Sequence, residues 1–154
     1  RRNTKVLKNW LIGNSSHVID LVFHLCGKPK KWNSWHSGRL KWHPNSARFS
    51  GSGITSKGIM FSYLSDWQAP GRWGLEFNTK RHKFILRPVE DLKIVKLGST
   101  LVKNIRINNK LDQKFKPGIY LQLKSFLKND FTLFCTLSEQ VEDVRIYSKI
   151  AGYL

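Results

Sequence analysis

Arg72-Trp73-Gly74-Leu75-Glu76-Phe77-Asn78 is the segment that decides the fold class of this chain. Trp73, Leu75 and Phe77 alternate with smaller or polar residues, which is the period of a β-strand with one buried face. A short polar link leads into a second apolar run, residues 83–87, which Pro88 ends. Strands joined by so short a link pair in antiparallel fashion, because parallel pairing needs a long crossover. The sequence therefore predicts a β-hairpin over residues 72–87.

Further strand-like segments flank this hairpin and bring the expected number of strands to six or seven. They are His36–Trp42, Ala47–Gly51, Lys57–Trp67, Leu92–Leu97 and Leu101–Ile107. The short links between them favour an antiparallel sheet, which can bury one face and leave the other in water.

Helical periodicity marks both ends of the chain. Apolar residues recur at helical spacing over 16–26, and Gly27 then ends that helix. Pro117-Gly118 opens a second helix, and Thr136-Leu137-Ser138-Glu139 has the pattern of a capping box for a third. The predicted buried face of this third helix consists of Leu137, Val141, Val144 and Ala151. We therefore expect an α+β fold: an open, mainly antiparallel β-sheet with helices covering one face.

Composition limits the classes of partner. The 154 residues amount to one domain, and 27 basic against 10 acidic residues give a net charge of +17, which favours an anionic partner. The excess is spread evenly over both halves without a polybasic tail, so we expect neither a membrane nor nucleic acid as the main partner. No apolar run approaches the roughly 20 residues that span a bilayer, and no signal peptide follows Arg1-Arg2, which predicts a cytoplasmic protein. Cys26 and Cys135 are expected to be buried free thiols, and a disulfide between them is the alternative.

The search for cofactor and metal motifs yields little. Gly51-Ser52-Gly53-Ile54-Thr55 resembles a dinucleotide loop superficially, but it lacks the third glycine and a following helix, so we predict a β-turn or bulge. The five histidines are scattered and no metal-ligand spacing occurs, so the sequence predicts no metal ligand. Among the six tryptophans, Trp73 is expected in the core, whereas Trp35 and Trp42 are better candidates for a solvated face.

The polar segment Asn14–Asp20 stands where the first helix is predicted to begin. Free backbone N–H groups and the helix dipole favour polar or anionic ligands at such an end. His17 lies there, and histidine titrates near neutral pH. In the alternative interpretation, Asn14, Ser15 and Ser16 are ordinary N-cap residues.

Several segments in order resemble the C-terminal domain of the Gfo/Idh/MocA oxidoreductases, particularly bacterial members associated with surface-polysaccharide or nucleotide-sugar metabolism. They are Asn14–Leu21, Ala69–Gly74, Leu86–Pro88, Lys114–Gly118 and Lys149–Tyr153. The resemblance implies a two-domain parent whose N-terminal Rossmann domain binds NAD or NADP. Residues 1–13 would then be a lead-in from that missing domain, and residues 14–154 a substrate-binding and oligomerisation domain. This chain alone would bind no cofactor and be inactive.

The resemblance also implies roles for individual residues. His17 would be the catalytic general acid/base for hydride transfer on a CH–OH group of a sugar. Asn14 and Ser15 would bind substrate hydroxyls, and Asp20 would support His17. Arg72 would meet a substrate phosphate or, in the alternative interpretation, simply be solvated. The face of the sheet would join copies into a homo-oligomer.

Two other interpretations stay open, and one of them rests on a departure from the family pattern. The family places an aspartate four residues before the histidine, and here that position is Gly13. A catalytically silent structural domain derived from a dehydrogenase would explain this glycine. A basic nucleic-acid-binding module that uses the tryptophans and the excess charge is the other alternative.

Overall fold

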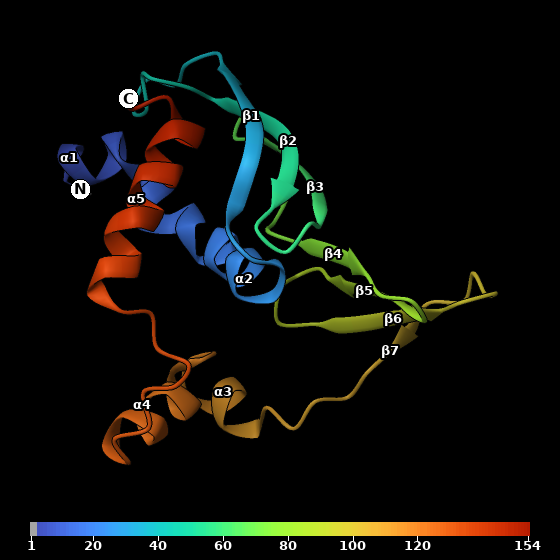
Figure 1. Ribbon diagram of the computed structural model, residues 1–154. Helices are drawn as coiled ribbons and strands as arrows, with labels where there is room; N and C mark the ends of the chain where they lie inside the picture. The colour runs from blue at the N-terminus through green and yellow to red at the C-terminus, as the bar shows by residue number, and fades with distance from the viewer. Residues whose placement is uncertain (1–2) are drawn as a thin grey trace. The chain divides into compact units, whose positions relative to one another are not determined.

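A computed structural model describes residues 3–154 (Figure 1). In chain order the elements are α1 (Thr4–Lys8), the π-helix η1 (Leu11–Ser15), α2 (Ser16–Cys26), β1 (Pro29–Ser37), β2 (Arg48–Thr55), β3 (Met60–Asp66), β4 (Leu75–Asn78), β5 (His82–Leu86), β6 (Leu92–Lys96), β7 (Lys103–Asn104), α3 (Lys110–Lys114), α4 (Ile119–Leu127) and α5 (Leu137–Ala151). The chain divides into two compact units. We call the first the discontinuous unit, because it joins the chain up to Gly71 with Leu137–Leu154, and the second, Arg72–Thr136, the inserted unit.

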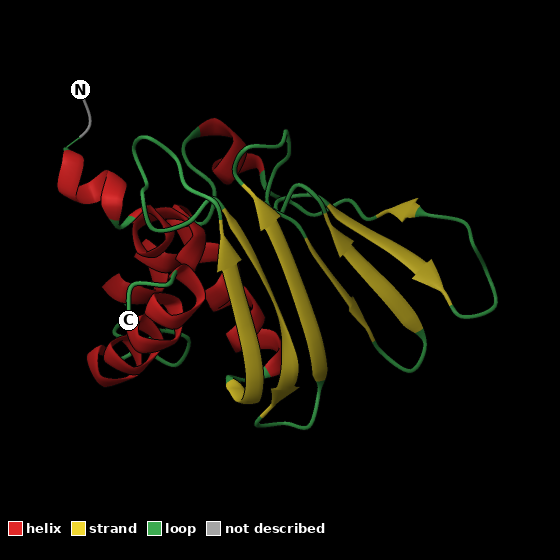
Figure 2. Cartoon of the chain, turned by 90° about the horizontal axis from the view of Figure 1, so that it is seen from above, coloured by secondary structure: helices red, strands yellow, loops and turns green. Residues whose placement is uncertain are grey.

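The discontinuous unit is a three-stranded antiparallel sheet with one face covered by helices (Figure 2). The strand order is β1-β2-β3, and α5 packs against β1, β2 and η1. Buried apolar residues from η1, β2 and α5 form the core: Leu11, Phe49, Tyr147, Ile150 and Ala151. The helices cover the sheet because Tyr147, Ile150 and Ala151 recur at helical spacing on one side of α5.

Two glycines of the central strand β2 let neighbouring side chains cross the sheet. A Cβ on Gly53 would clash with the backbone carbonyl oxygen of Lys31. A Cβ on Gly51 would clash with the ring of Tyr63, whose hydroxyl donates to Ser34 Oγ at 2.7 Å. No β-turn forms over residues 51–55, because the glycines provide room inside a paired strand. The register shift in this pairing lies in β1 between Pro29 and Lys31, opposite Thr55 and Ile54.

A buried histidine, His43, connects the segment after α5 to the loop after β1 by hydrogen bonds. His43 Nδ1 lies 2.6 Å from the backbone oxygen of Ser46, which can only accept, so Nδ1 carries the proton. His43 Nε2 must then accept from the hydroxyl of Tyr153, at 2.6 Å. The backbone N–H of Leu11 donates to the same hydroxyl at 3.4 Å. The loop after β1, the segment after α5 and η1 are thus joined by one chain of hydrogen bonds.

The inserted unit contains a four-stranded antiparallel sheet in the order β4-β5-β6-β7, followed by α3 and α4. Leu75 pairs with Leu86 and Phe77 with Phe84, which confirms the predicted hairpin. The rings of Phe77 and Phe84 stack with centroids 4.9 Å apart. Nevertheless, every described residue from Arg72 to Thr136 is at least partly exposed.

The α+β class and the antiparallel pairing are confirmed, but the seven strands form two open sheets instead of one. The strand predicted at His36–Trp42 instead spans Pro29–Ser37, because Gly38 adopts a left-handed conformation, with φ of 72°, that ends it. The strand predicted at Leu101–Ile107 shrinks to Lys103–Asn104, which pairs with β6 alone.

The described residues of the predicted lead-in 1–13 are mostly helical and Leu11 enters the core, whereas Arg1-Arg2 lie outside the described residues. The connection of this segment to an upstream domain stays a prediction. Two predictions about the burial of side chains need correction. In α5, the predicted core residues Leu137 and Val141 are exposed. Cys26 is a buried free thiol as predicted, but Cys135 is exposed.

Trp35 and Trp42 are exposed, as predicted for a solvated face, and Trp42 stacks on Trp67 with centroids 5.6 Å apart. Within residues 3–154, none of the helices combines the length and the apolar character needed to cross a bilayer.

Candidate functional site

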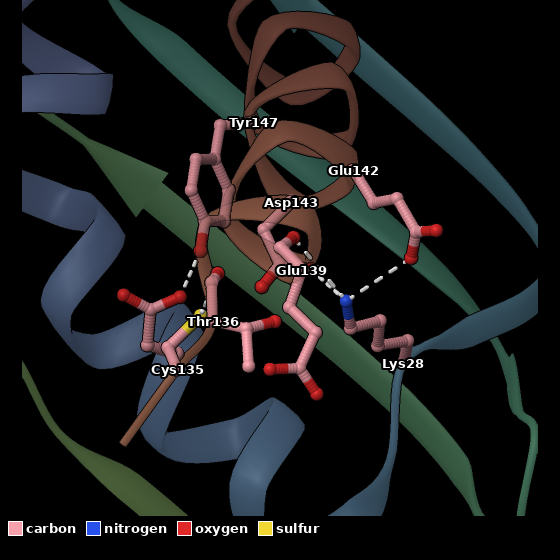
Figure 3. Close-up of polar contacts among 8 residues, drawn as sticks. Lys28, Cys135, Thr136, Glu139, Glu142, Asp143 and Tyr147 are labelled. Atoms are coloured by element: carbon pink, nitrogen blue, oxygen red, sulfur yellow. Dashed lines mark hydrogen bonds and ion pairs between the residues drawn. The ribbon is translucent and has the colours of Figure 1, made fainter. Parts of the chain in front are cut away.

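A group of polar side chains lies where α2, α5 and the start of β1 meet in the discontinuous unit (Figure 3). It consists of Asp20 on α2, Lys28 before β1, and Glu142, Asp143 and Tyr147 on α5. We call these five residues the α2–α5 cluster. Asp143 and Tyr147 are four residues apart on α5, so they share one side of the helix.

Tyr147 fixes the position of Asp20. Its side chain is fully buried, its ring stacks on Phe23 with centroids 6.1 Å apart, and its hydroxyl donates a hydrogen bond to Asp20 Oδ1. Burial raises the pKa of Asp20, and the negative charge of Asp143 raises it further, while His17 and Lys28 act in the opposite direction. Asp20 therefore holds a proton more readily than an exposed aspartate does.

Lys28 neutralises the acidic side of α5. Its Nζ lies 2.7 Å from Asp143 Oδ1 and 3.4 Å from Glu142 Oε2, and it donates to the backbone oxygen of Glu139 (Figure 3). Burial opposes the charge on Lys28, but its bonds to Asp143 and Glu142 outweigh burial and raise its pKa. Since Asp143 is buried, this ion pair fixes the end of α2 against α5.

His17 lies in the first turn of α2, exposed to solvent and three residues before Asp20. Its positive charge acts on the carboxyl group of Asp20. His17 and Asp20 are therefore brought together as the sequence suggested, and Tyr147 joins them through Asp20.

The helix end expected at Asn14–Asp20 is absent, because the chain is already helical there. Asn14 and Ser15 belong to η1, and α2 follows without a break. The backbone N–H of Gly13 donates to the oxygen of Asn9, and the backbone N–H of Ser16 donates to the oxygen of Leu11. The prediction of free N–H groups at this point is thus wrong. A π-helical turn, a feature frequent at functional sites, directly precedes α2, whose second residue is His17.

Arg72 belongs to the inserted unit. It is exposed in the segment before β4, which begins at Leu75 and not at Arg72 as predicted.

Sequence reasoning missed Lys28, Asp143 and Tyr147. A signal for them exists: Asp143, Tyr147, Ile150 and Ala151 follow helical spacing, with an acidic residue at a position where an apolar one is expected. A charged residue on an otherwise apolar face requires a partner, and Lys28 provides it.

Comparisons with known proteins add no further assignment: no protein-family model, no curated protein and no solved structure matches this chain.

Proposed function

We propose that this chain is the substrate-binding and oligomerisation domain of an NAD(P)-dependent oxidoreductase that acts on a sugar or nucleotide sugar in surface-polysaccharide metabolism. The resemblance of Asn14–Leu21 and Ala69–Gly74 to the Gfo/Idh/MocA oxidoreductases supports it. The observation that carries the proposal is the row His17–Asp20–Tyr147, in which a buried phenol holds a carboxylate one turn from an exposed imidazole.

Oxidation of a CH–OH group releases the proton of the hydroxyl, and a general base must accept it. His17 is suited to this task, because histidine changes its charge near neutral pH and this side chain is exposed. Asp20 lies one turn further along the same helix, and the hydroxyl of Tyr147 keeps its carboxyl group in place. Asn14 and Ser15, half-buried on the preceding turn, would bind substrate hydroxyls.

The nicotinamide cofactor would accept or supply the hydride, and the proposal assigns it to a domain outside these 154 residues. Gly51 and Gly53 do not fit a pyrophosphate, since the backbone of β1 and the ring of Tyr63 fill the space beside them. We therefore derive no step through the cofactor within this chain.

The outer face of the three-stranded sheet is the part that would join copies of the protein. Trp35 on β1 and Leu64 on β3 share this face, because both are in register with Ser50 of β2. Trp35, Met60 and Leu64 are 58%, 86% and 82% exposed, which is unusual for apolar side chains gathered on one face. Light scattering after gel filtration should give a dimer or larger oligomer, and Leu64→Arg should reduce it to a monomer. A monomeric wild-type protein would refute this part.

The function is tested by measuring NAD(P)H formation by the intact gene product with a panel of nucleotide sugars. His17→Ala should lower turnover by about 100-fold or more, as expected for loss of a general acid/base. His24→Ala is the matched control, because His24 is an exposed histidine in the last turn of the same helix, and it should leave turnover unchanged. Equal effects of the two substitutions would remove His17 from the chemistry.

A catalytically silent structural domain is the second candidate, and Gly13 favours it. Absence of turnover with every sugar would support that candidate. A Cβ on Gly13 would meet no atom within 4 Å, so Gly13→Asp can restore the family's aspartate without a clash. Turnover that appears only in Gly13→Asp would identify a silenced dehydrogenase.

A further inference from the structure

A basic hollow lies at the tips of the sheet in the inserted unit. Its volume is about 320 Å³, and its lining comes from the turn between β4 and β5 and from the end of β6. Arg81, His82, Lys83 and Lys96 line it together with Ser99, and none of its lining residues is acidic.

Backbone hydrogen bonds give this hollow a fixed frame. Thr79 Oγ1 accepts from the backbone N–H of His82 at 3.1 Å and donates to the oxygen of the same residue. The N–H of Leu97 donates to the oxygen of Arg81 at 2.9 Å, which ties the end of β6 to the turn. His82 and Lys96 face each other as register partners. The backbone that carries the cationic side chains is therefore held in place by hydrogen bonds.

The charge of the hollow comes mainly from two side chains. Lys83 is paired with Glu76, its Nζ lying 2.6 Å from Oε2, and so contributes little net charge. Arg81 and Lys96 are exposed and line the hollow, Arg81 from the turn between β4 and β5 and Lys96 from the last residue of β6. Ser99 Oγ accepts from the N–H of Leu101 at 3.0 Å, so its own hydroxyl hydrogen can be donated to a ligand.

We infer that this hollow binds the phosphate groups of a small phosphorylated molecule. Arginine, lysine and hydroxyl donors at the tips of the sheet form charge-assisted hydrogen bonds to phosphate oxygens. The volume is at the lower limit of small-molecule pockets, which suits one or two phosphate groups. A nucleic acid would require a continuous basic track, whereas these cations gather at the tips of the sheet. This site stands independently of the proposed oxidoreductase function.

Calorimetric titration of the whole chain with inorganic pyrophosphate and with UDP tests the inference. We expect a dissociation constant on the order of 1 mM or lower at low salt. The double variant Arg81→Gln/Lys96→Gln should weaken binding by about tenfold or more, since it removes charge-assisted bonds. Both side chains are exposed, so the variant should fold, and circular dichroism verifies this. Similar affinity for the two ligands would mean that phosphates alone are recognised, and tighter UDP binding that the nucleoside adds contacts.

Lys103→Gln/Lys110→Gln is the matched control, because it removes the same net charge from exposed positions that do not line the hollow. It should change the affinity less than about twofold, within the range of a long-range charge effect. Three results would overturn the inference: no binding of either ligand, equal weakening in the two double variants, or a single-stranded oligonucleotide that binds more tightly and responds equally to both variants.

Discussion

The two units differ in how their side chains are buried, although both are antiparallel sheets with helices. The discontinuous unit has a core around Phe49 and Tyr147, and its ion pair Lys28–Asp143 has a buried carboxylate. The inserted unit has no buried residue among Arg72–Thr136, and its ion pair Lys83–Glu76 is exposed on both sides. Similar contacts at similar distances should therefore contribute differently to stability, because burial and not geometry sets their value.

The largest difference is expected from removing an aromatic ring in each unit. Phe49 is 2% exposed, so Phe49→Ala should lower the free energy of unfolding by about 3–5 kcal/mol. Phe115 is 72% exposed, and Phe115→Ala should change it by no more than about 0.5 kcal/mol. Urea unfolding followed by tryptophan fluorescence and far-ultraviolet circular dichroism measures both. Five of the six tryptophans lie in the discontinuous unit, so fluorescence reports mainly on that unit. Equal losses would show that the difference in burial does not govern stability.

One ion pair in each unit allows a closer comparison, because the two pairs have nearly the same geometry. The nitrogen–oxygen distances are 2.7 Å for Lys28–Asp143 and 2.6 Å for Lys83–Glu76. The side chain of Asp143 is 6% exposed and that of Glu76 is 41% exposed. Lys28→Met leaves a buried carboxylate uncompensated and should destabilise by about 2–3 kcal/mol, somewhat less than for a fully buried pair, since Lys28 itself reaches water. Lys83→Met should cost at most about 1 kcal/mol.

Chemical unfolding of both methionine variants provides the measurement for the ion pairs. A second substitution, Asp143→Leu in the Lys28→Met background, should recover part of the lost stability by removing the unpaired charge. If that double variant is less stable than Lys28→Met alone, the isolated carboxylate is not the cause of the loss.

The smallest expected difference concerns the pH dependence of stability, in which one carboxyl group of each unit acts in the opposite direction to the other. The pKa of Asp20 is raised above its ordinary 3.8 by burial, so its contribution is full below that value and is lost as the pH rises through the folded-state pKa. The pKa of Glu76 is lowered from 4.5, chiefly by its bond to Lys83, so its contribution is present above 4.5 and is lost on acidification.

Unfolding free energies of Asp20→Asn and Glu76→Gln between pH 7 and pH 3 test these signs. Relative to its variant, the wild-type protein should gain stability on acidification in the first comparison and lose it in the second. If the stability difference between wild type and variant changed with pH in the same direction in both comparisons, the two carboxyl groups would not have opposite environments.

The sequence predicts secondary structure well where the apolar residues follow a single helical or strand period. The hairpin of β4 and β5 and the bounds of α2 follow directly from apolar spacing. The extent of η1 does not, because the polar residues Asn14 and Ser15 look like N-cap residues until the preceding turn is known to be helical. Gly51 and Gly53 mislead for a similar reason, because glycine is typical of turns. Only the ring of Tyr63 beside Gly51 and the backbone of Lys31 beside Gly53 show why this strand needs glycine.

The candidate site was predicted in part. His17 and Asp20 are three residues apart on one helix, so their proximity follows from the sequence alone. Asp143 and Tyr147 join them, together with Lys28, from a helix more than a hundred residues further along the chain, and no local pattern specifies such a contact. Tertiary packing brings these residues together.

The division of the discontinuous unit has a consequence for biosynthesis. A ribosome releases the chain from its N-terminus, so β1, β2 and β3 emerge well before the core residues Tyr147, Ile150 and Ala151. Until α5 arrives, the apolar face of this sheet has no helix from the far end of the chain to cover it, and the whole inserted unit must be synthesised in between. Contacts between such distant segments also close slowly. The nascent chain should therefore expose Phe49 and its neighbours for the time needed to add residues 72–151, which makes this stretch of translation a period of chaperone dependence.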